Sequence, residues 1–460
     1  MVRYMTALLF VFALAANSTQ LPLENFTKHG DYLNMKLSPD GKHISARVRM
    51  EGRVFLVIMD ASTMKVVGGV RPRDGDEIHS AQWINNNRIV YQFQESVYYI
   101  DQPVATGELF AIDVDGSNSD ILYGYRAGEN SMGSNIKKRE DTRATPQIIS
   151  LLPDDDKHIL IAEYPWRLEG RFYYDDRKKP SIVTKLNVYS GKKRKITTIP
   201  YPGARPFATD DGEVKFVRWV DNDTGYYQAA YRENEDSEWK NLTDKLDDSY
   251  VPISLNADGS KLYLSGDASE EEFTSYFEFD LKTEKLTQLF SGMKADIAGL
   301  NWDPELEKPV VGISYPDKHQ YFYAPGESKT KKLHKMLASA FEGQDVYITS
   351  QSKDGGLLLL HVSSDVNPGE YYLFDTKTNG ASFVWANRSW LDPRTLASKQ
   401  PIKFKTSDDL DINGYLTMPI GHTDDVKAPL VVMIHGGPHG PRDYWDFDGE
   451  VQLLANRGYA

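Results

Sequence analysis

Short apolar segments separated by polar turns fill the chain from about residue 36 to about residue 390. Within them apolar and polar residues alternate, or a few apolar residues follow one another, and helical spacing is almost absent. Alternation is typical of a half-buried β-strand, and a short apolar run is typical of a strand buried on both faces. This part of the chain is therefore predicted to be all-β.

A recurring unit organises these segments. An Asp-Gly or similar turn opens onto a strand, and a later strand ends in an acidic residue and a second turn. The clearest copies of the opening part are 37–48, 150–164, 254–267 and 350–365. We count about seven units, spaced by very roughly 40 to 65 residues, a spacing that indicates propeller blades, solenoids or arrays. Four short strands per unit favour a seven-bladed β-propeller. A pair of β-sandwiches is the alternative.

The pattern changes after residue 390. Prolines at 393 and 401 mark residues 391–401 as a linker, and residues 402–419 read as two alternating strands around an acidic turn. Leu430 to Ile434 form an apolar run, the signature of a strand buried in a parallel sheet. Residues 450–457 carry helical spacing with Gly458 as the stop, and Tyr459-Ala460 starts another strand. The segment 402–460 is predicted to be the beginning of an α/β domain, cut off within its sheet.

The predicted strand runs into His435, Gly436, Gly437 and Pro438. Two glycines after a buried strand permit a sharp turn that exposes backbone N–H groups, since neither carries a Cβ. In α/β-hydrolases such a loop follows the third strand and offers one N–H to the oxyanion of a tetrahedral intermediate. The sequence therefore predicts a loop of this kind at residues 435–438.

Composition limits the partners of the chain. It has 460 residues, no cysteine and a formal net charge of −13, so disulfides and thiolate metal sites are excluded and nucleic acid is not expected. The run from Asp113 to Asp120 looks like a calcium loop but lacks the glutamate of the twelfth position, which favours a blade hairpin. No cofactor and no metal are predicted.

The N-terminus reads as a secretory signal. Arg3 supplies a positive charge, residues 7–14 are apolar, and Ala13 and Ala15 provide an A-x-A cleavage site. We predict a signal peptide over residues 1–18, a secreted or periplasmic protein, and no membrane span after its removal. Residues 19–35 are an N-terminal segment, 36–390 the propeller, 391–401 the linker and 402–460 the truncated hydrolase part.

From these residues the chain resembles the prolyl oligopeptidase family of serine peptidases (S9), in its acylaminoacyl-peptidase and dipeptidyl-peptidase-like branch. The segments that carry the resemblance are 435–439 (HGGPH) with Arg442-Asp443, 454–460 (LANRGYA), 37–41 (LSPDG) and 367–372 (NPGEYY). The resemblance implies a seven-bladed propeller that restricts an α/β-hydrolase active site to short peptides, with the Gly437 amide as one oxyanion donor. It also implies that His435 orders the loop together with Gly436 and is not the catalytic base, because the family's base lies near its C-terminus.

The rest of the family's catalytic machinery has no counterpart in these residues. The elbow G-x-S-x-G is absent from the 460 residues, and no acid or histidine of the Ser/Asp/His triad can be placed. The 460-residue chain is therefore predicted to be inactive, although the complete protein would be an exopeptidase or oligopeptidase. A non-catalytic propeller that binds peptides or proteins and an esterase on the same scaffold are the alternatives. Peptide-bond specificity and oligomeric state stay open.

Overall fold

The computed structural model describes residues 20–96, 102–128, 141–267, 273–423, 425, 427–437 and 440–460. The signal peptide predicted for residues 1–18 lies outside these residues. The chain divides into two compact units. One comprises 29–363 and 369–388, and the other comprises the N-terminal residues up to Lys28, 364–368 and 389–460.

The first unit contains seven antiparallel sheets in its described residues, each built from strands that follow one another in sequence. The first three sheets are β1 (Tyr32–Leu37), β2 (His43–Met50), β3 (Arg53–Asp60) and β4 (Val66–Val70); β5 (Asp76–Trp83), β6 (Arg88–Glu95), β8 (Leu109–Asp113) and β9 (Asp120–Tyr123), with β7 (Val104–Ala105) on β6; and β10 (Ala144–Ser150), β11 (His158–Glu169), β13 (Pro180–Asn187) and β14 (Lys193–Pro202), with β12 (Phe172–Asp175) on β11.

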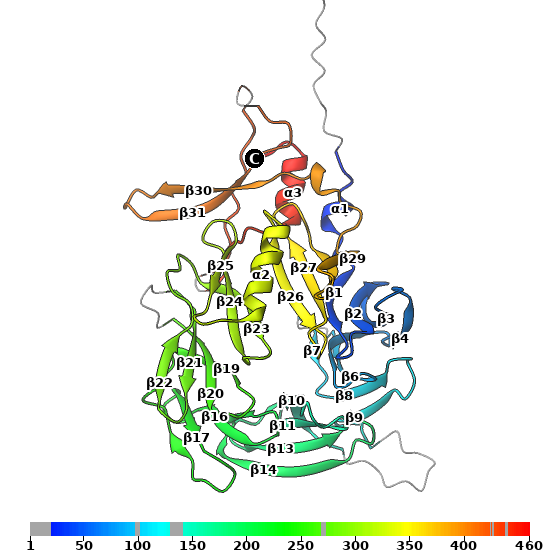
Figure 1. Ribbon diagram of the computed structural model, residues 1–460, viewed down its shortest axis with the longest axis vertical. Helices are drawn as coiled ribbons and strands as arrows, with labels where there is room; N and C mark the ends of the chain where they lie inside the picture. The colour runs from blue at the N-terminus through cyan, green and yellow to red at the C-terminus, as the bar shows by residue number, and fades with distance from the viewer. Residues whose placement is uncertain are drawn as a thin grey trace, which may run out of the picture. The chain divides into compact units, whose positions relative to one another are not determined.

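The other four sheets are β15 (Arg205–Ala208), β16 (Val214–Val220), β17 (Tyr227–Tyr231) and β18 (Lys240–Asn241); β19 (Tyr250–Leu255), β20 (Lys261–Gly266), β21 (Ser275–Asp280) and β22 (Lys285–Gln288); β23 (Ile297–Asp303), β24 (Lys308–Ser314) and β25 (Gln320–Tyr323); and β26 (Asp345–Gln351), β27 (Leu357–Ser363), β28 (Glu370–Asp375) and β29 (Gly380–Ala386). Figure 1 shows them one after another around a ring, with the first strand of each sheet toward the middle. The predicted seven-bladed propeller is confirmed.

The ring closes by packing and hydrogen bonds between its first and last sheets. Met35 and Leu37 of β1 share a core with Leu359 of β27. The Lys36 ammonium group donates to the Thr349 carbonyl oxygen at 2.6 Å, and the Leu37 amide donates to the Ser350 hydroxyl at 2.9 Å. Within the described residues these two sheets exchange no strand, so the closure depends on side-chain complementarity and these cross-sheet bonds.

The apolar runs read from the sequence are strands with a sheet packed on each side. In β3, Val54, Leu56 and Ile58 belong to the core shared with the second sheet, whereas Met59 belongs to the core shared with the last one. Because successive side chains of a strand point to opposite faces, a strand inside a propeller must be apolar on both.

Local side-chain bonds explain why the turn motif recurs. In four of the propeller sheets, the turn between the first and second strands begins with a Ser, Thr or Asn. The side chain of this residue donates to an Asp two residues later and accepts from a backbone amide four or five residues later. These residues are Ser38, Thr209, Asn256 and Ser352. The turn after the third strand uses an Asx side chain that accepts from the amides two and three residues later, at Asp60, Asn187, Asp280 and Asp375. Such bonds satisfy the backbone donors of the turn.

The Asp60 turn predicts a loss of stability in acid. Hydrogen bonds from the hydroxyl groups of Ser62 and Thr63 lower the pKa of Asp60 from 3.8 to about 2. A carboxyl whose pKa is lowered by folding contributes stability above its unfolded pKa, and this contribution is lost as the pH falls from about 4 toward 2. We expect Thr63→Val to weaken this pH dependence relative to the wild type, measured by urea unfolding between pH 7 and pH 2.5. An unchanged pH profile for the variant would contradict this assignment.

The sixth sheet departs from the predicted all-strand pattern. Its fourth strand is absent from the described residues, and α2 (Lys329–Ala340) follows β25 instead. The Ser328 hydroxyl caps this helix by accepting from the Lys331 amide at 3.0 Å, and Leu337 is buried in the core of the seventh sheet. The prediction that residues 36–390 contain almost no helix is confirmed for the described residues apart from α2, which forms because an N-cap and one apolar stripe suffice for a short packed helix.

The second unit contains α1 (Glu24–Thr27), a 3₁₀ turn η2 (Pro393–Thr395), the hairpin of β30 (Lys399–Lys405) and β31 (Asp411–Thr417), and α3 (Gly449–Asn456). The predicted hairpin and the predicted C-terminal helix are both confirmed. Gly458 ends the helix with a φ of 89°, a left-handed conformation that glycine adopts readily. The hairpin begins at Lys399, inside the range that the sequence assigns to the linker.

Candidate functional site

The candidate site lies in the second unit, where residues 429–437 follow the β30–β31 hairpin. Leu430 to Ile434 form no strand and are exposed, with Ile434 exposing 87% of its surface. The prediction of a buried strand over these five residues is therefore wrong for the chain as it stands. A strand gains its stability from neighbouring strands and from cover on its faces, and the described residues provide neither along most of this segment.

One residue does pair with this segment. The Val431 amide donates to the Ala460 carbonyl oxygen at 2.8 Å, and the Ala460 amide donates to the Pro429 carbonyl oxygen at 2.8 Å. Two bonds that flank Leu430 in this way are the pattern of a parallel ladder. Residues 429–431, α3 and residue 460 thus have the connectivity of a β-α-β unit, in which a helix links two parallel strands.

Helix α3 is fixed by polar contacts within its own unit. The Asp448 carboxylate caps it by accepting from the Glu450 and Val451 amides, at 2.8 and 3.1 Å. Gln452 is buried and accepts from the Ala397 amide at 2.9 Å, while its amide group donates to the Ala397 carbonyl oxygen at 2.7 Å. Because the side-chain oxygen and the NH₂ group of Gln452 both bond to the backbone of Ala397, the helix is held in one position against that segment.

A second cluster lies before this helix. The Lys399 ammonium group donates to the Tyr444 carbonyl oxygen at 3.1 Å and lies 3.4 Å from the Asp446 carboxylate. The Trp445 indole N–H donates to the Lys399 carbonyl oxygen at 3.2 Å. Burial raises the pKa of Asp446, and Lys399 opposes that rise. Sequence reasoning missed this cluster, because Lys399 lies more than 40 residues from its partners and none of them belongs to a motif.

The loop residues predicted to serve catalysis lie directly after the exposed segment. His435 Nδ1 donates to the Gly436 carbonyl oxygen at 2.8 Å, and a Cβ added to Gly436 would meet no atom within 4 Å. Gly437 is the last described residue before a gap, and Pro438 and His439 lie outside the described residues. The contact between His435 and Gly436 is local and is compatible with a loop-ordering role.

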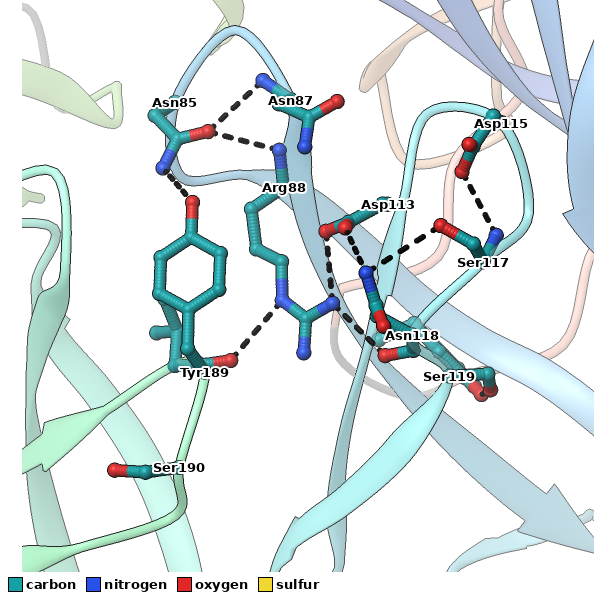
Figure 2. A network of polar contacts seen from close by, with 12 residues as sticks. Asn85, Asn87, Arg88, Asp113, Asp115, Ser117, Asn118, Ser119, Tyr189 and Ser190 are labelled. Carbon is teal, nitrogen blue, oxygen red and sulfur yellow. Dashed lines mark hydrogen bonds and ion pairs between the residues drawn. The ribbon is translucent and has the colours of Figure 1, made fainter.

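Buried charge elsewhere in the described residues has a structural use. Arg88 is the largest fully buried side chain there and lies between the second and third sheets. Its guanidinium group donates to Asp113 Oδ1 at 2.8 Å, to the Asn118 carbonyl oxygen at 2.9 Å and to the Val188 carbonyl oxygen at 3.0 Å (Figure 2). The ring of Tyr189 lies 5.0 Å from the guanidinium carbon. These contacts join two blades, so this cluster stabilises the propeller.

Two further kinds of functional element were sought in the described residues. No cluster of three or more His, Cys, Asp or Glu side chains there could hold a metal ion. No helix in those parts of the chain is both long enough and apolar enough to cross a bilayer. The Asp113–Asp120 run forms the turn between β8 and β9, as expected for a blade hairpin.

Comparisons with known proteins support the family resemblance. No family model matches the chain. Dipeptidyl aminopeptidase BIII of Pseudoxanthomonas mexicana is 23% identical over 93% of this chain and 58% of its own length. Dipeptidyl peptidase family member 6 of Caenorhabditis elegans is 23% identical over 54% of this chain and 36% of its own length. The chain thus spans a little over half of the first of these relatives and about a third of the second.

Solved structures show the same fold. The acylaminoacyl peptidase of Pyrococcus horikoshii aligns with a TM-score of 0.58 and 14% identity over 95% of this chain and 65% of its own. A puromycin hydrolase aligns with a TM-score of 0.59 and 14% identity over 95% of this chain and 66% of its own. The resemblance to the prolyl oligopeptidase family predicted from the sequence is confirmed.

Proposed function

Because the chain is related to the prolyl oligopeptidase family, we propose that it forms the propeller and the first part of the hydrolase domain of a serine peptidase that cleaves short peptides. In this proposal residues 36–390 form the propeller, 391–401 the linker and 402–460 the start of the hydrolase domain. A signal peptide over residues 1–18 directs the protein to the periplasm or the exterior.

The observation that carries the proposal is the pairing of Leu430 with Ala460 around α3. Hydrolases of this class are built on a mainly parallel sheet whose strands are joined by helices. A parallel bridge over a single helix, with a His-Gly-Gly segment a few residues after its first bridged residue, is the local arrangement that such a sheet requires. The relatives named as dipeptidyl peptidases agree with peptides as the substrate class.

The chemistry follows from the family. A serine attacks the peptide carbonyl with a histidine as base and an acidic residue that orients it. When the serine attacks, the carbonyl oxygen of the substrate becomes a singly bonded oxyanion that carries the developing negative charge. The Gly437 amide donates a hydrogen bond to this oxyanion. His435 and Gly436 hold the loop in place, and the propeller admits only short peptides. The triad has no counterpart in the 460 residues, so this chain alone is expected not to cleave peptides.

The proposal is tested by reading the source gene beyond the codon of Ala460. We expect an open frame that continues the strand and reaches a G-x-S-x-G elbow. The purified 460-residue chain is then compared with the extended protein on dipeptide 4-nitroanilides, with and without a blocked N-terminus. We expect hydrolysis by the extended protein alone, abolished by changing the elbow serine to alanine.

Three outcomes would overturn the proposal. Hydrolysis by the 460-residue chain would place the catalytic groups within that chain. An extended frame without an elbow, or a stop codon at this point, would leave a propeller that binds peptides or proteins without cleaving them. Preference for short acyl esters over anilides would indicate an esterase.

A further inference from the structure

The blade-to-blade interfaces of the propeller are mostly apolar, but the interface between the first two sheets is polar at its inner end. Asn34 and Lys36 of β1, Ser45 and Arg47 of β2, and His79 of β5 line a cavity of about 110 Å³ there. Farther out along the same interface the side chains of β3 and β6 form an apolar core. The cavity lies where the first strands surround the middle of the ring.

Two cations share this cavity without a carboxylate. Lys36 donates one hydrogen bond, to the Thr349 carbonyl oxygen, and Arg47 donates one, to the His79 carbonyl oxygen, among the described residues. Neither forms an ion pair in the described parts of the chain. An ammonium group has three N–H donors and a guanidinium group has five, so each retains N–H groups that can donate to a ligand or to water.

The charge of the whole chain makes this pair of cations more informative. The formal net charge is −13, and exposed carboxylates accompany many of the other cations. Burial lowers the pKa of both Lys36 and Arg47, and no nearby carboxylate counteracts this effect. Lys36 and Arg47 are only half-buried, so water reaches both side chains. No Asp or Glu lines the cavity with them, so no carboxylate there would compete with an anion that binds between the two cations.

We propose that this cavity binds a single small oxyanion, namely a carboxylate such as the C-terminal group of a short peptide, between Lys36 and Arg47. Charge-assisted bonds from the ammonium and guanidinium groups would hold its two oxygens. A volume of about 110 Å³ accommodates such a group with a few waters but not a whole side chain and backbone. The site itself does not depend on peptidase activity, whereas the identification of the carboxylate as part of a peptide rests on the proposed function.

The experiment uses the 460-residue chain and three probes at constant ionic strength: N-acetylglycine, N-acetylglycinamide and inorganic phosphate. Binding is measured by isothermal titration calorimetry and by the rise of the melting temperature that a ligand specific to the folded state produces. We expect saturable binding of N-acetylglycine with a Kd on the order of 1 mM and none of the amide. Stronger binding of phosphate than of N-acetylglycine would assign the same site to free phosphate rather than to a peptide and overturn the peptide part of the proposal.

Three variants locate the site. Lys36→Met and Arg47→Met each remove one cation, and each is expected to raise the Kd for N-acetylglycine at least about tenfold. Arg49→Met is the matched control, because Arg49 lies on the same strand and its side chain is absent from the cavity lining. General stabilisation by excluded anions would affect all three variants equally.

Folding of each variant is checked by its circular dichroism spectrum and melting temperature without ligand. Should one of the methionine variants not fold, Lys36→Gln and Arg47→Gln repeat the measurement with polar side chains. The proposal is overturned if the wild-type chain binds no anion, or if folded variants at Lys36 and Arg47 bind as well as the control. Because no step requires catalysis, such a result leaves the peptidase proposal intact.

Discussion

Replacing Arg88 by methionine is expected to lower the free energy of unfolding by about 3–5 kcal/mol, the range for breaking a buried ion pair by removing one partner. Arg88 exposes 1% of its surface, and its loss leaves Asp113 buried with the Asn118 side chain as its remaining polar contact. The carbonyl oxygens of Asn118 and Val188 lose their donor at the same time. Methionine keeps most of the aliphatic volume, so the loss measures the polar contacts.

The matched control is Arg71→Met. Arg71 pairs with Glu51 at 3.0 Å in the same unit, but both side chains are more than half exposed, so this substitution should cost about 0–1 kcal/mol. Urea unfolding followed by circular dichroism yields both values. We also expect Arg88→Met/Asp113→Asn to recover part of the loss, since the second change removes the stranded carboxylate. Equal effects of Arg88→Met and Arg71→Met would show that the buried network adds nothing to stability.

The contacts of Arg88 are of a kind that the sequence does not predict, because they join residues far apart along the chain. Arg88 pairs with a residue 25 positions away and with a backbone oxygen 100 positions away in the next sheet. The turn motifs could be read because their bonds join residues within five positions, as between Ser38 and His43. The number of blades follows from such local repeats, whereas the contacts between blades depend on which side chains the closed ring brings together.

Two further differences have physical causes. The helix α2 has a capping serine and Leu333 and Leu337 on one face, a signal that is present in the sequence but short and surrounded by lysines. The four-strand repeat of the other sheets therefore predicts a strand in this segment, and the helix signal is too weak to contradict it. The run Leu430–Ile434 has the composition of a buried strand. A strand is buried only where other strands and side chains cover it, and here a single residue, Leu430, is paired.

For the candidate site the sequence leads to a prediction of its type, which stays a prediction, and to none of its geometry. The glycine pair after an apolar run identifies a turn that exposes N–H groups, because neither glycine has a Cβ. The 460 residues contain no G-x-S-x-G elbow, so the position of the Gly437 amide relative to the proposed nucleophile cannot be read from them. By contrast, the cations Lys36 and Arg47 belong to no motif, and the sequence offers no reason to connect them.

If the source gene continues to an elbow and a triad as proposed, the second large effect is expected at Gly437 of that extended protein. Gly437→Pro removes the amide proton assigned to the oxyanion and should lower kcat by about 10²–10³-fold, the loss found when one such donor is removed. KM should change little, because the oxyanion forms in the transition state and not in the bound substrate. Steady-state kinetics on a dipeptide 4-nitroanilide separate the two constants.

Gly437→Ala is the control that tests the cause. It adds one methyl group but keeps the amide proton, so kcat should fall much less than in Gly437→Pro. A proline at position 437 also restricts the backbone conformation of Gly436, the residue before it. Gly436→Ala is therefore a second control, because it restricts that backbone without removing an N–H donor. If the alanine variants lose as much activity as Gly437→Pro, the loop acts through its shape, and the oxyanion donor must be sought at another amide.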